Sequence, residues 1–283
     1  WGWRRRHSEH PQRILVLHHL LLGDTLLLTA LLAKLRARYP SSEIVMTVPR
    51  AIAPLYAGRP YGVIAHSFDP RDLGTFWPLL NTPRFDLVVL PADNRWSWLA
   101  RAIGARWIVG IAGDRPARKN WPVDELLPYS ATPTAFVETA AELIPGASPA
   151  PYRTQDWPMP ESDGAPVFGT CYAVLHVGAS SPLKLWPAQH WRELAVWLEA
   201  RGMTVVWSAG PGETAILNAI EPASSARPRI EGTLSLLALA HVLANAKLLI
   251  SPDTGIAHLG RIVGVPTVTL FGPGSSTIFG PGV

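Results

Sequence analysis

Short apolar runs alternate with longer segments of helical periodicity, and this alternation constrains the fold more than any other feature. Residues 13–17 form an apolar run of strand length, and residues 24–38 follow with apolar positions over most of a helical surface. The same order returns after about residue 167. Strands that are apolar throughout and alternate with helices are typical of parallel sheets covered by helices on both faces. The sequence therefore predicts an α/β protein.

The predicted elements fall into two blocks, separated by residues 113–166. This middle segment contains ten prolines and one helical stretch, at 134–143. We expect it to be an interdomain connection. The first block has predicted strands at 13–17, 42–48, 61–68, 85–90 and 107–111, with helices at 24–38, 51–57 and 94–103. The second has strands at 172–176, 204–207, 248–251 and 267–271, with helices at 187–201, 212–220, 234–246 and 254–263.

Composition limits the classes of function. Hydrophobic residues make up 48% of the chain and charged residues 16%, which fits a globular protein and argues against disorder. A net charge of +4 suits an anionic ligand or membrane surface, but no basic helix or zinc knuckle points to nucleic acid. Cys171 is the single cysteine, so no disulfide forms within the chain, a reducing compartment is expected, and the thiol should pack as a small apolar group.

Two segments raise the question of membrane contact. Residues 14–33 are leucine-rich, but Asp24 and the histidines His18 and His19 interrupt them, so a strand followed by a buried helix fits better than a membrane span. Residues 4–6 are three arginines close to Trp1 and Trp3, which suits acidic lipid headgroups, although such an end is more often a solvated tail.

The segment Ile-Ser-Pro-Asp-Thr-Gly-Ile-Ala-His, residues 250–258, joins an apolar strand to a helix. Asp253 or Thr254 can cap that helix through a side-chain oxygen, and Gly255 lets a ligand approach the first backbone amides. Those amides and the helix dipole favour a phosphate. His258 follows one turn later, at the same end. The alternative is that Asp253 caps an ordinary helix and His258 is a surface histidine.

The loop after the strand 172–176 offers an open backbone, two hydroxyls and a cation, at Gly178, Ser180, Ser181 and Lys184. Such a loop suits a diphosphate. Taken alone, its lysine is more simply a solvated surface group. Because parallel strands end at one edge of their sheet, however, this loop and the 250–258 turn should lie together.

Gly23 and Asp24 end the loop after the first strand. Gly23 permits a tight turn, and Asp24 stands where the next helix starts, at the carboxyl edge of the sheet. The structural alternative is an ordinary N-cap. In a partly dry cleft such a carboxylate can also accept a proton from a hydroxyl group as a bond forms.

Residues 210–215, Gly-Pro-Gly-Glu-Thr-Ala, match the pattern G-x-G-x-x-A, with Glu231 at a suitable distance downstream. By itself this predicts a dinucleotide site. It follows an internal strand of the second block, however, so we instead expect Glu213 to accept hydrogen bonds from a ribose or a base. No D-x-D pair and no His/Asp/Glu group has metal-ligand spacing, so neither a metal nor a cofactor is expected.

Together these residues resemble glycosyltransferase family 9, the bacterial heptosyltransferases of the lipopolysaccharide core. The resemblance is carried by 13–17 with Gly23 and Asp24, by 178–187, by 251–258 and by 264–273. It implies the GT-B fold, with two Rossmann-like doubly wound domains facing a central cleft. It also implies an inverting, metal-independent transfer of a sugar, usually the heptose of ADP-heptose, to a lipid-linked or other glycan acceptor.

The resemblance assigns roles to single residues. Asp24 would activate the acceptor hydroxyl. The donor would be held by Ser180, Ser181, Lys184, Asp253, Thr254, Gly255 and His258, with Glu213 near the nucleoside. Residues 1–112 would form the acceptor domain and 167–283 the donor domain. Candidate acceptor contacts are Gly23, Arg95, Arg101, Arg115, Arg118 and Lys119, although each of the basic residues is more simply a surface charge.

Two other functions stay open. A non-catalytic protein of the same fold would bind sugar nucleotides or glycans without turnover. A nucleotide-dependent oxidoreductase would use residues 210–215 to bind NAD. The transferase is expected in the cytoplasm, or peripherally on the cytoplasmic face of the inner membrane.

Overall fold

The computed structural model describes residues 8–129, 134–147, 153–161 and 164–280. The chain divides into two compact units. Unit 1 holds the described residues up to 147 together with 156–158, and unit 2 holds 153–155 and 159–280. The arginines at 4–6, with Trp1 and Trp3, lie outside the described residues.

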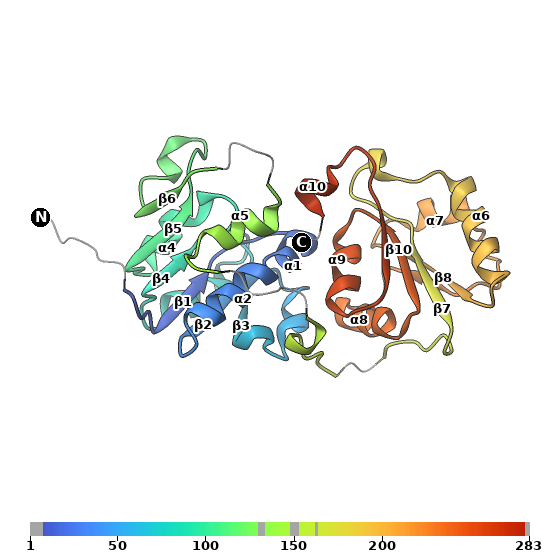
Figure 1. Ribbon diagram of the computed structural model, residues 1–283, viewed down its shortest axis with the longest axis horizontal. Coiled ribbons are helices and arrows are strands. Elements are labelled where there is room, and N and C mark those ends of the chain that lie inside the picture. The colour runs from blue at the N-terminus through green and yellow to red at the C-terminus, as the bar shows by residue number, and fades with distance from the viewer. Residues whose placement is uncertain (1–7, 130–133, 148–152, 162–163, 281–283) are drawn as a thin grey trace, which may run out of the picture. The chain divides into compact units, whose positions relative to one another are not determined.

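Unit 1 is built on a six-stranded parallel sheet in the order β3-β2-β1-β4-β5-β6 (Figure 1). Its strands are β1 Arg13–Val16, β2 Glu43–Val48, β3 Val63–Ser67, β4 Leu87–Val89, β5 Trp107–Ile111 and β6 Glu125–Leu127. Its helices are α1 Leu22–Leu27, α2 Thr29–Arg38, α3 Trp77–Leu80, α4 Ser97–Ala102 and α5 Phe136–Glu142. Short 3-10 turns include η1 Ala53–Tyr56, η2 Pro60–Gly62, η3 Leu73–Thr75, η4 Asn94–Trp96 and η5 Ala117–Lys119.

Unit 2 is built on a five-stranded parallel sheet in the order β11-β10-β7-β8-β9. Its strands are β7 Tyr172–His176, β8 Thr204–Ala209, β9 Arg229–Glu231, β10 Leu248–Pro252 and β11 Thr267–Leu270. Its helices are α6 Ala188–Glu199, α7 Thr214–Ile220, α8 Leu236–Asn245, α9 Gly255–Ile262 and α10 Ser276–Phe279, and the 3-10 turn η7 covers Pro182–Lys184. The α/β prediction is confirmed.

The two cores are layers of side chains between each sheet and its helices. In unit 1, Leu15, Val88 and Ile108 of the central strands are fully buried. In unit 2, Trp191 of α6 and Trp207 of β8 are fully buried with β7. The prediction that Cys171 packs as a small apolar group is wrong: it stands just before β7 and is exposed.

The predicted connection over 113–166 does not stand apart from the first domain. Its residues 125–127 form β6, which pairs with β5 and extends the sheet of unit 1. Its helix α5 lies beside α2 (Figure 1), where Val137 and Ala141 bury Leu27 and Ala30. The many prolines suggested a linker, but apolar residues between them complete the core of unit 1.

The sheet order places the ligand-binding edge of each unit. In unit 1 the chain runs outward from β1 through β2 and β3, then returns to the other side of β1 with β4. In unit 2 the same reversal occurs between β7 and β10. At such a switch point the two loops leaving the carboxyl ends of the strands diverge and leave a crevice. Each unit therefore has one favoured site, beyond β1 and β4 or beyond β7 and β10.

Candidate active site

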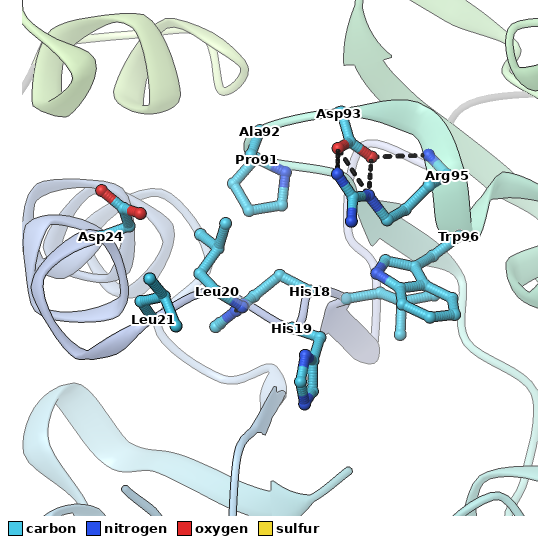
Figure 2. Close-up of a pocket in the computed structure, with 11 residues that line it drawn as sticks. His18, His19, Leu20, Leu21, Asp24, Pro91, Ala92, Asp93, Arg95 and Trp96 are labelled. Atoms are coloured by element: carbon cyan, nitrogen blue, oxygen red, sulfur yellow. Dashed lines mark hydrogen bonds and ion pairs between the residues drawn. The ribbon is translucent and has the colours of Figure 1, made fainter. Parts of the chain in front are cut away.

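A pocket lies at the switch point of unit 1 (Figure 2). It is open to solvent and encloses about 480 Å³, including its mouth. The loop after β1 contributes Leu17, His18, His19, Leu20 and Leu21, helix α1 contributes Asp24, and the segment after β4 contributes Pro91, Ala92, Asp93, Arg95 and Trp96.

Asp24 lies on one side of this pocket, opposite the Asp93–Arg95 pair (Figure 2). The expectation that Asp24 starts the helix needs one correction. Helix α1 begins at Leu22, with Leu21 as an N-cap that makes no side-chain capping bond, so Asp24 is an acidic residue within the first turn. Gly23 lies inside the same helix and makes no tight turn. A carboxylate in the first turn is stabilised by the helix dipole.

The loop that carries the pocket is held by Thr47 of β2. The Thr47 hydroxyl accepts the His18 backbone N–H at 2.8 Å and donates to the His18 carbonyl at 2.7 Å. Nδ1 of His18 in turn accepts the Leu20 N–H at 3.2 Å. Thr25 continues this support from α1, because its hydroxyl donates to the Leu20 carbonyl at 3.2 Å. The backbone leading to Asp24 is thus fixed from both sides.

His18 is a neutral residue of this loop. It is 2% exposed, and burial, with a smaller contribution from His19, lowers its pKa to about 3. Because Nδ1 accepts a hydrogen bond, the proton of the neutral ring is on Nε2. Within the described part of the chain, Nε2 is buried without a hydrogen-bond partner. His18 therefore serves as an internal acceptor and does not supply positive charge to the pocket at neutral pH.

Arg95 lines the pocket, but it is not a free cation. Its guanidinium contacts the Asp93 carboxylate at 2.5 Å, while Asp93 also caps η4 by accepting the Arg95 N–H at 2.8 Å. Burial acts to raise the pKa of Asp93, but the hydrogen bonds and charge of Arg95 outweigh it and leave that pKa lowered. The same contacts raise the pKa of Arg95.

Two residues that line the pocket, His19 and Trp96, belong to an aromatic cluster around Phe68. The ring of Phe68 meets those of Phe76 and Trp96 edge-on, each with a centroid distance of 5.0 Å, and His19 packs on it at 6.0 Å. Phe68 is fully buried, so segments after β1, β3 and β4 share one apolar anchor.

The other basic candidates lie outside this pocket. Arg101 contributes to the fold, because its guanidinium contacts Asp124 at 2.5 Å and the Ala105 carbonyl at 3.0 Å. Lys119 pairs with Asp114 at 3.4 Å. Arg115 and Arg118 are exposed on the segment after β5, and neither lines the pocket.

At the switch point of unit 2, Lys184 and Asp253 form an ion pair. Nζ of Lys184 donates to the Asp253 carboxylate at 2.7 Å and to its carbonyl at 3.0 Å. The Asp253 side chain is 5% exposed and that of Lys184 is 26% exposed. The expectation that these two loops meet at one edge is thus correct. The pair presents a partly exposed ammonium group beside the start of α9.

The start of α9 differs in detail from the sequence prediction. Thr254 is the N-cap, yet its side chain makes no capping bond, since its hydroxyl contacts the Ser251 hydroxyl at 3.1 Å. Asp253 does not cap the helix either, because it faces Lys184. Gly255 is the first helical residue. The first turn of α9 is therefore left without a side-chain cap, which is the arrangement that an anionic ligand uses.

His258 lies on the first turns of α9, as predicted. Burial lowers its pKa, and the charge of Asp253 partly offsets this, so the imidazole is neutral at pH 7. Ser181 caps η7, with its hydroxyl accepting the Leu183 N–H at 3.4 Å, and Ser180 is exposed in the same loop. The glycines after β11 close over the ion pair, because a Cβ on Gly274 would lie 3.2 Å from the Asp253 carboxylate.

Glu213 is engaged within the protein. Its carboxylate accepts the Gly210 N–H at 2.6 Å, and a Cβ at Gly178 would lie 1.6 Å from it. The carboxylate is thus hydrogen-bonded within the loop after β8 and lies close against the backbone of the loop after β7. Gly178 and Gly210 are needed for this close approach, so Gly210, one of the two glycines of the 210–215 pattern, has a structural role that requires no dinucleotide.

The comparisons with known proteins agree with this geometry. The model of glycosyltransferase family 9 (heptosyltransferase) matches residues 76–282, which include the Lys184 and Asp253 loops. The chain belongs to glycosyltransferase family 9.

Curated members of the family resemble the chain over different lengths. Lipopolysaccharide heptosyltransferase 1 of Pseudomonas aeruginosa is 33% identical over 194 residues, which cover 62% of this chain but only 51% of that protein. Lipopolysaccharide heptosyltransferase 3 of Escherichia coli is 25% identical over 280 residues, which cover 88% of this chain and 80% of that protein. The match thus spans about half of the Pseudomonas relative.

Solved structures show the same fold. The structure described as E. coli heptosyltransferase WaaC with ADP superimposes with a TM-score of 0.77 at 21% identity, covering 95% of this chain and 90% of that one. E. coli ADP-heptose lps heptosyltransferase II gives a TM-score of 0.74 at 22% identity, covering 95% of this chain and 87% of that one. The family 9 chain has the GT-B type of architecture, with two parallel α/β units.

Several residues of the site were not identified from the sequence. Thr47 was not predicted because its role depends on pairing between β1 and β2. Asp93 was missed although it stands after a strand and before a short helix, the same kind of position as Asp24. In the described part of the chain, no group of three His, Cys, Asp or Glu could hold a metal ion, and no helix is long and apolar enough to cross a membrane.

Proposed function

We propose that this family 9 chain is an inverting, metal-independent glycosyltransferase. In this proposal it moves a sugar, the heptose of ADP-heptose, to a lipopolysaccharide-core acceptor. The observation that carries the proposal is the Lys184–Asp253 pair beside the uncapped start of α9. This is a site for a diphosphate at the switch point of a parallel sheet. The names of the relatives, lipopolysaccharide heptosyltransferases, support the sugar and the acceptor class.

In the proposed reaction, unit 2 binds the donor. The ammonium group of Lys184 and the first amides of α9 contact the diphosphate, and Ser180 and Ser181 add hydroxyls at the edge of the same loop. As the bond between the anomeric carbon and the diphosphate oxygen breaks, negative charge grows on the leaving diphosphate. Fixed donors and the helix dipole stabilise that charge without needing to reorganise.

Unit 1 binds the acceptor in the proposed reaction. The acceptor hydroxyl reaches Asp24 in the pocket, and the carboxylate takes its proton as the oxygen attacks the anomeric carbon from the face opposite the diphosphate. The new C–O bond then has the inverted configuration. Arg95 stays paired with Asp93 and so contributes a rigid, locally neutral hydrogen-bonding surface.

Calorimetric titration with ADP, UDP, GDP and NAD, first without and then with magnesium, tests the donor half. We expect metal-independent binding of ADP that Lys184→Ala weakens and that Lys247→Ala, at an exposed lysine of the same unit, leaves unchanged. Binding of NAD alone would favour the oxidoreductase.

Turnover with ADP-heptose and heptose-deficient lipopolysaccharide tests the acceptor half. Asp24→Asn should keep the ADP affinity and lower kcat by about 100-fold or more, as expected for loss of a general base. The matched control is Asp72→Asn, which changes an exposed acid of unit 1 and keeps its cap on η3. If the wild-type protein binds the donor, shows no transfer and is indifferent to Asp24→Asn, it is a binding protein.

A further inference from the structure

Exposed tryptophans gather at the carboxyl edge of the unit 1 sheet, close to the pocket. Trp98 follows β4 and is 55% exposed, and Trp121 follows β5 and is 74% exposed. Because the strands are parallel, the segments that leave their carboxyl ends emerge at one edge. Leu21, which lines the pocket after β1, is also 75% exposed. Large apolar side chains in contact with water at a shared edge indicate an interaction surface.

Two of these segments are joined into one surface. Nε1 of Trp98 donates to the Arg118 carbonyl at 3.1 Å, and the hydroxyl of Ser97 donates to the Lys119 carbonyl at 2.6 Å. The amide of Asn94 reaches Asn120 at 2.7 Å. The segment containing η5 is thus fastened to η4 and α4, which lead directly from the pocket residue Trp96. We call Trp98, Arg115, Arg118 and Trp121 the Trp98 surface.

The Trp98 surface carries an excess of positive charge. The connections 90–106 and 112–124 contain three acidic residues, and each has a basic partner: Asp93 pairs with Arg95, Asp114 with Lys119 and Asp124 with Arg101. Arg115 and Arg118 are exposed, and no acid among the described residues forms an ion pair with either. Their charge therefore remains available to an outside partner.

We propose that the Trp98 surface docks unit 1 on an anionic lipid bilayer. The proposal rests on the proposed function, because a lipopolysaccharide acceptor is anchored in a membrane and its sugar must reach the adjacent pocket. Tryptophan rings partition into the headgroup region, and surplus arginines are attracted to anionic headgroups. A folded protein partner would be expected to match a larger apolar patch.

Co-sedimentation with phosphatidylcholine vesicles, with and without phosphatidylglycerol, tests the docking. The wild-type chain should bind the anionic vesicles, and salt should weaken the binding. Arg115→Gln with Arg118→Gln should weaken it about 25-fold, at roughly fivefold for each arginine. Trp98→Ser and Trp121→Ser should each weaken it about tenfold.

The matched controls lie in unit 2. Trp197 is 51% exposed and stacks on Arg201 at 3.5 Å, so Trp197→Ser removes a ring that lies beside an arginine and is about as exposed as Trp98. Arg192→Gln removes an exposed charge. Both should bind vesicles as the wild type does. Trp98→Ser also removes the hydrogen bond to the Arg118 carbonyl and could unfold the protein. If circular dichroism shows that Trp98→Ser is unfolded, the vesicle binding of Trp121→Ser is the test of the proposal.

Failure of wild-type binding, or equal losses in Trp121→Ser and Trp197→Ser, overturns the docking surface. Equal binding to neutral and anionic vesicles overturns the role of the arginines. ADP titration of the same samples separates the two proposals, because vesicle binding needs no donor. If ADP binds and vesicles do not, the docking surface is wrong while the donor site stands. If vesicles bind and ADP does not, the proposed ADP site is wrong while the docking surface stands.

Discussion

The Lys184–Asp253 pair yields an asymmetric prediction for stability. Lys184→Met leaves the Asp253 carboxylate, 5% exposed, without its cation, and an unpaired buried charge costs about 3 kcal/mol. Asp253→Asn leaves Lys184, which is 26% exposed and can turn toward water, so the loss should be about 1 kcal/mol. The double variant Lys184→Met with Asp253→Asn leaves no unpaired charge in the protein and should also lose about 1 kcal/mol of stability. The coupling energy is then about 3 kcal/mol.

Native-state hydrogen exchange measures this in the intact chain. The backbone amide of Leu249 donates to the carbonyl of Pro266, just before β11, and that of Asp253 donates to the carbonyl of Leu270 in β11. The free energy of opening at these two amides reports on unit 2 alone. Amides of β1 in unit 1 provide the internal reference. If the two single losses simply add in the double variant, or if Asp253→Asn costs more than Lys184→Met, the reasoning from burial is refuted.

Three further outcomes are expected. The pKa of His18 falls from an ordinary 6.5 to about 3 on folding. Between pH 6.5 and pH 3 the unfolded chain therefore binds one proton more than the folded chain. The free energy of unfolding drops as pH falls through this range, by up to about 1.4 kcal/mol per pH unit. Urea unfolding at pH 7 and pH 5 should show a smaller drop in His18→Asn. Gly178→Ala drives a methyl group into Glu213 and should cost about 2 kcal/mol by urea unfolding, part of which Gly178→Ala with Glu213→Ala recovers. Ser235→Ala removes the hydrogen bond to the Ala238 N–H at the start of α8 and should lower stability by about 1 kcal/mol on thermal unfolding.

The sequence predicted the parts of the fold that local patterns determine. Strands β1 and β7 were found because each coincides with a run of four apolar residues, at 14–17 and at 172–175. Strands β6 and β9 were missed because each has three residues and at most two of them are apolar, in Glu125–Leu127 and in Arg229–Glu231. Such a strand is recognised only through the neighbour that it pairs with.

The site divides in the same way. The sequence predicted that Asp24, Lys184 and Asp253 each lie on a segment that follows a strand. It could do so because the loops that leave parallel strands emerge at one edge of the sheet. The ion-pair partners of these side chains could not be predicted from the sequence. Asp253 was one of two candidates to cap α9, yet its carboxylate pairs with Lys184, 69 residues away. Arg101 was indistinguishable in sequence from a surface charge, yet it is fixed by Asp124, an acid that lies near it only after β6 joins the sheet.

Residues 156–158, which follow α5 in the chain, belong to unit 1. This contact determines the shortest fragment of the chain in which unit 1 is expected to fold by itself. Trp157 is 4% exposed and its ring packs on Tyr56 at 4.9 Å, while the Pro158 carbonyl lies where Gly58 leaves room for it. A fragment cut at residue 112 would lack β6 and α5, and its bare β5 edge would invite self-association. One cut at residue 147 would still expose Tyr56. A fragment that continues through Pro158 keeps β6, α5 and the Trp157 ring, the segments that complete the packing of unit 1 described above.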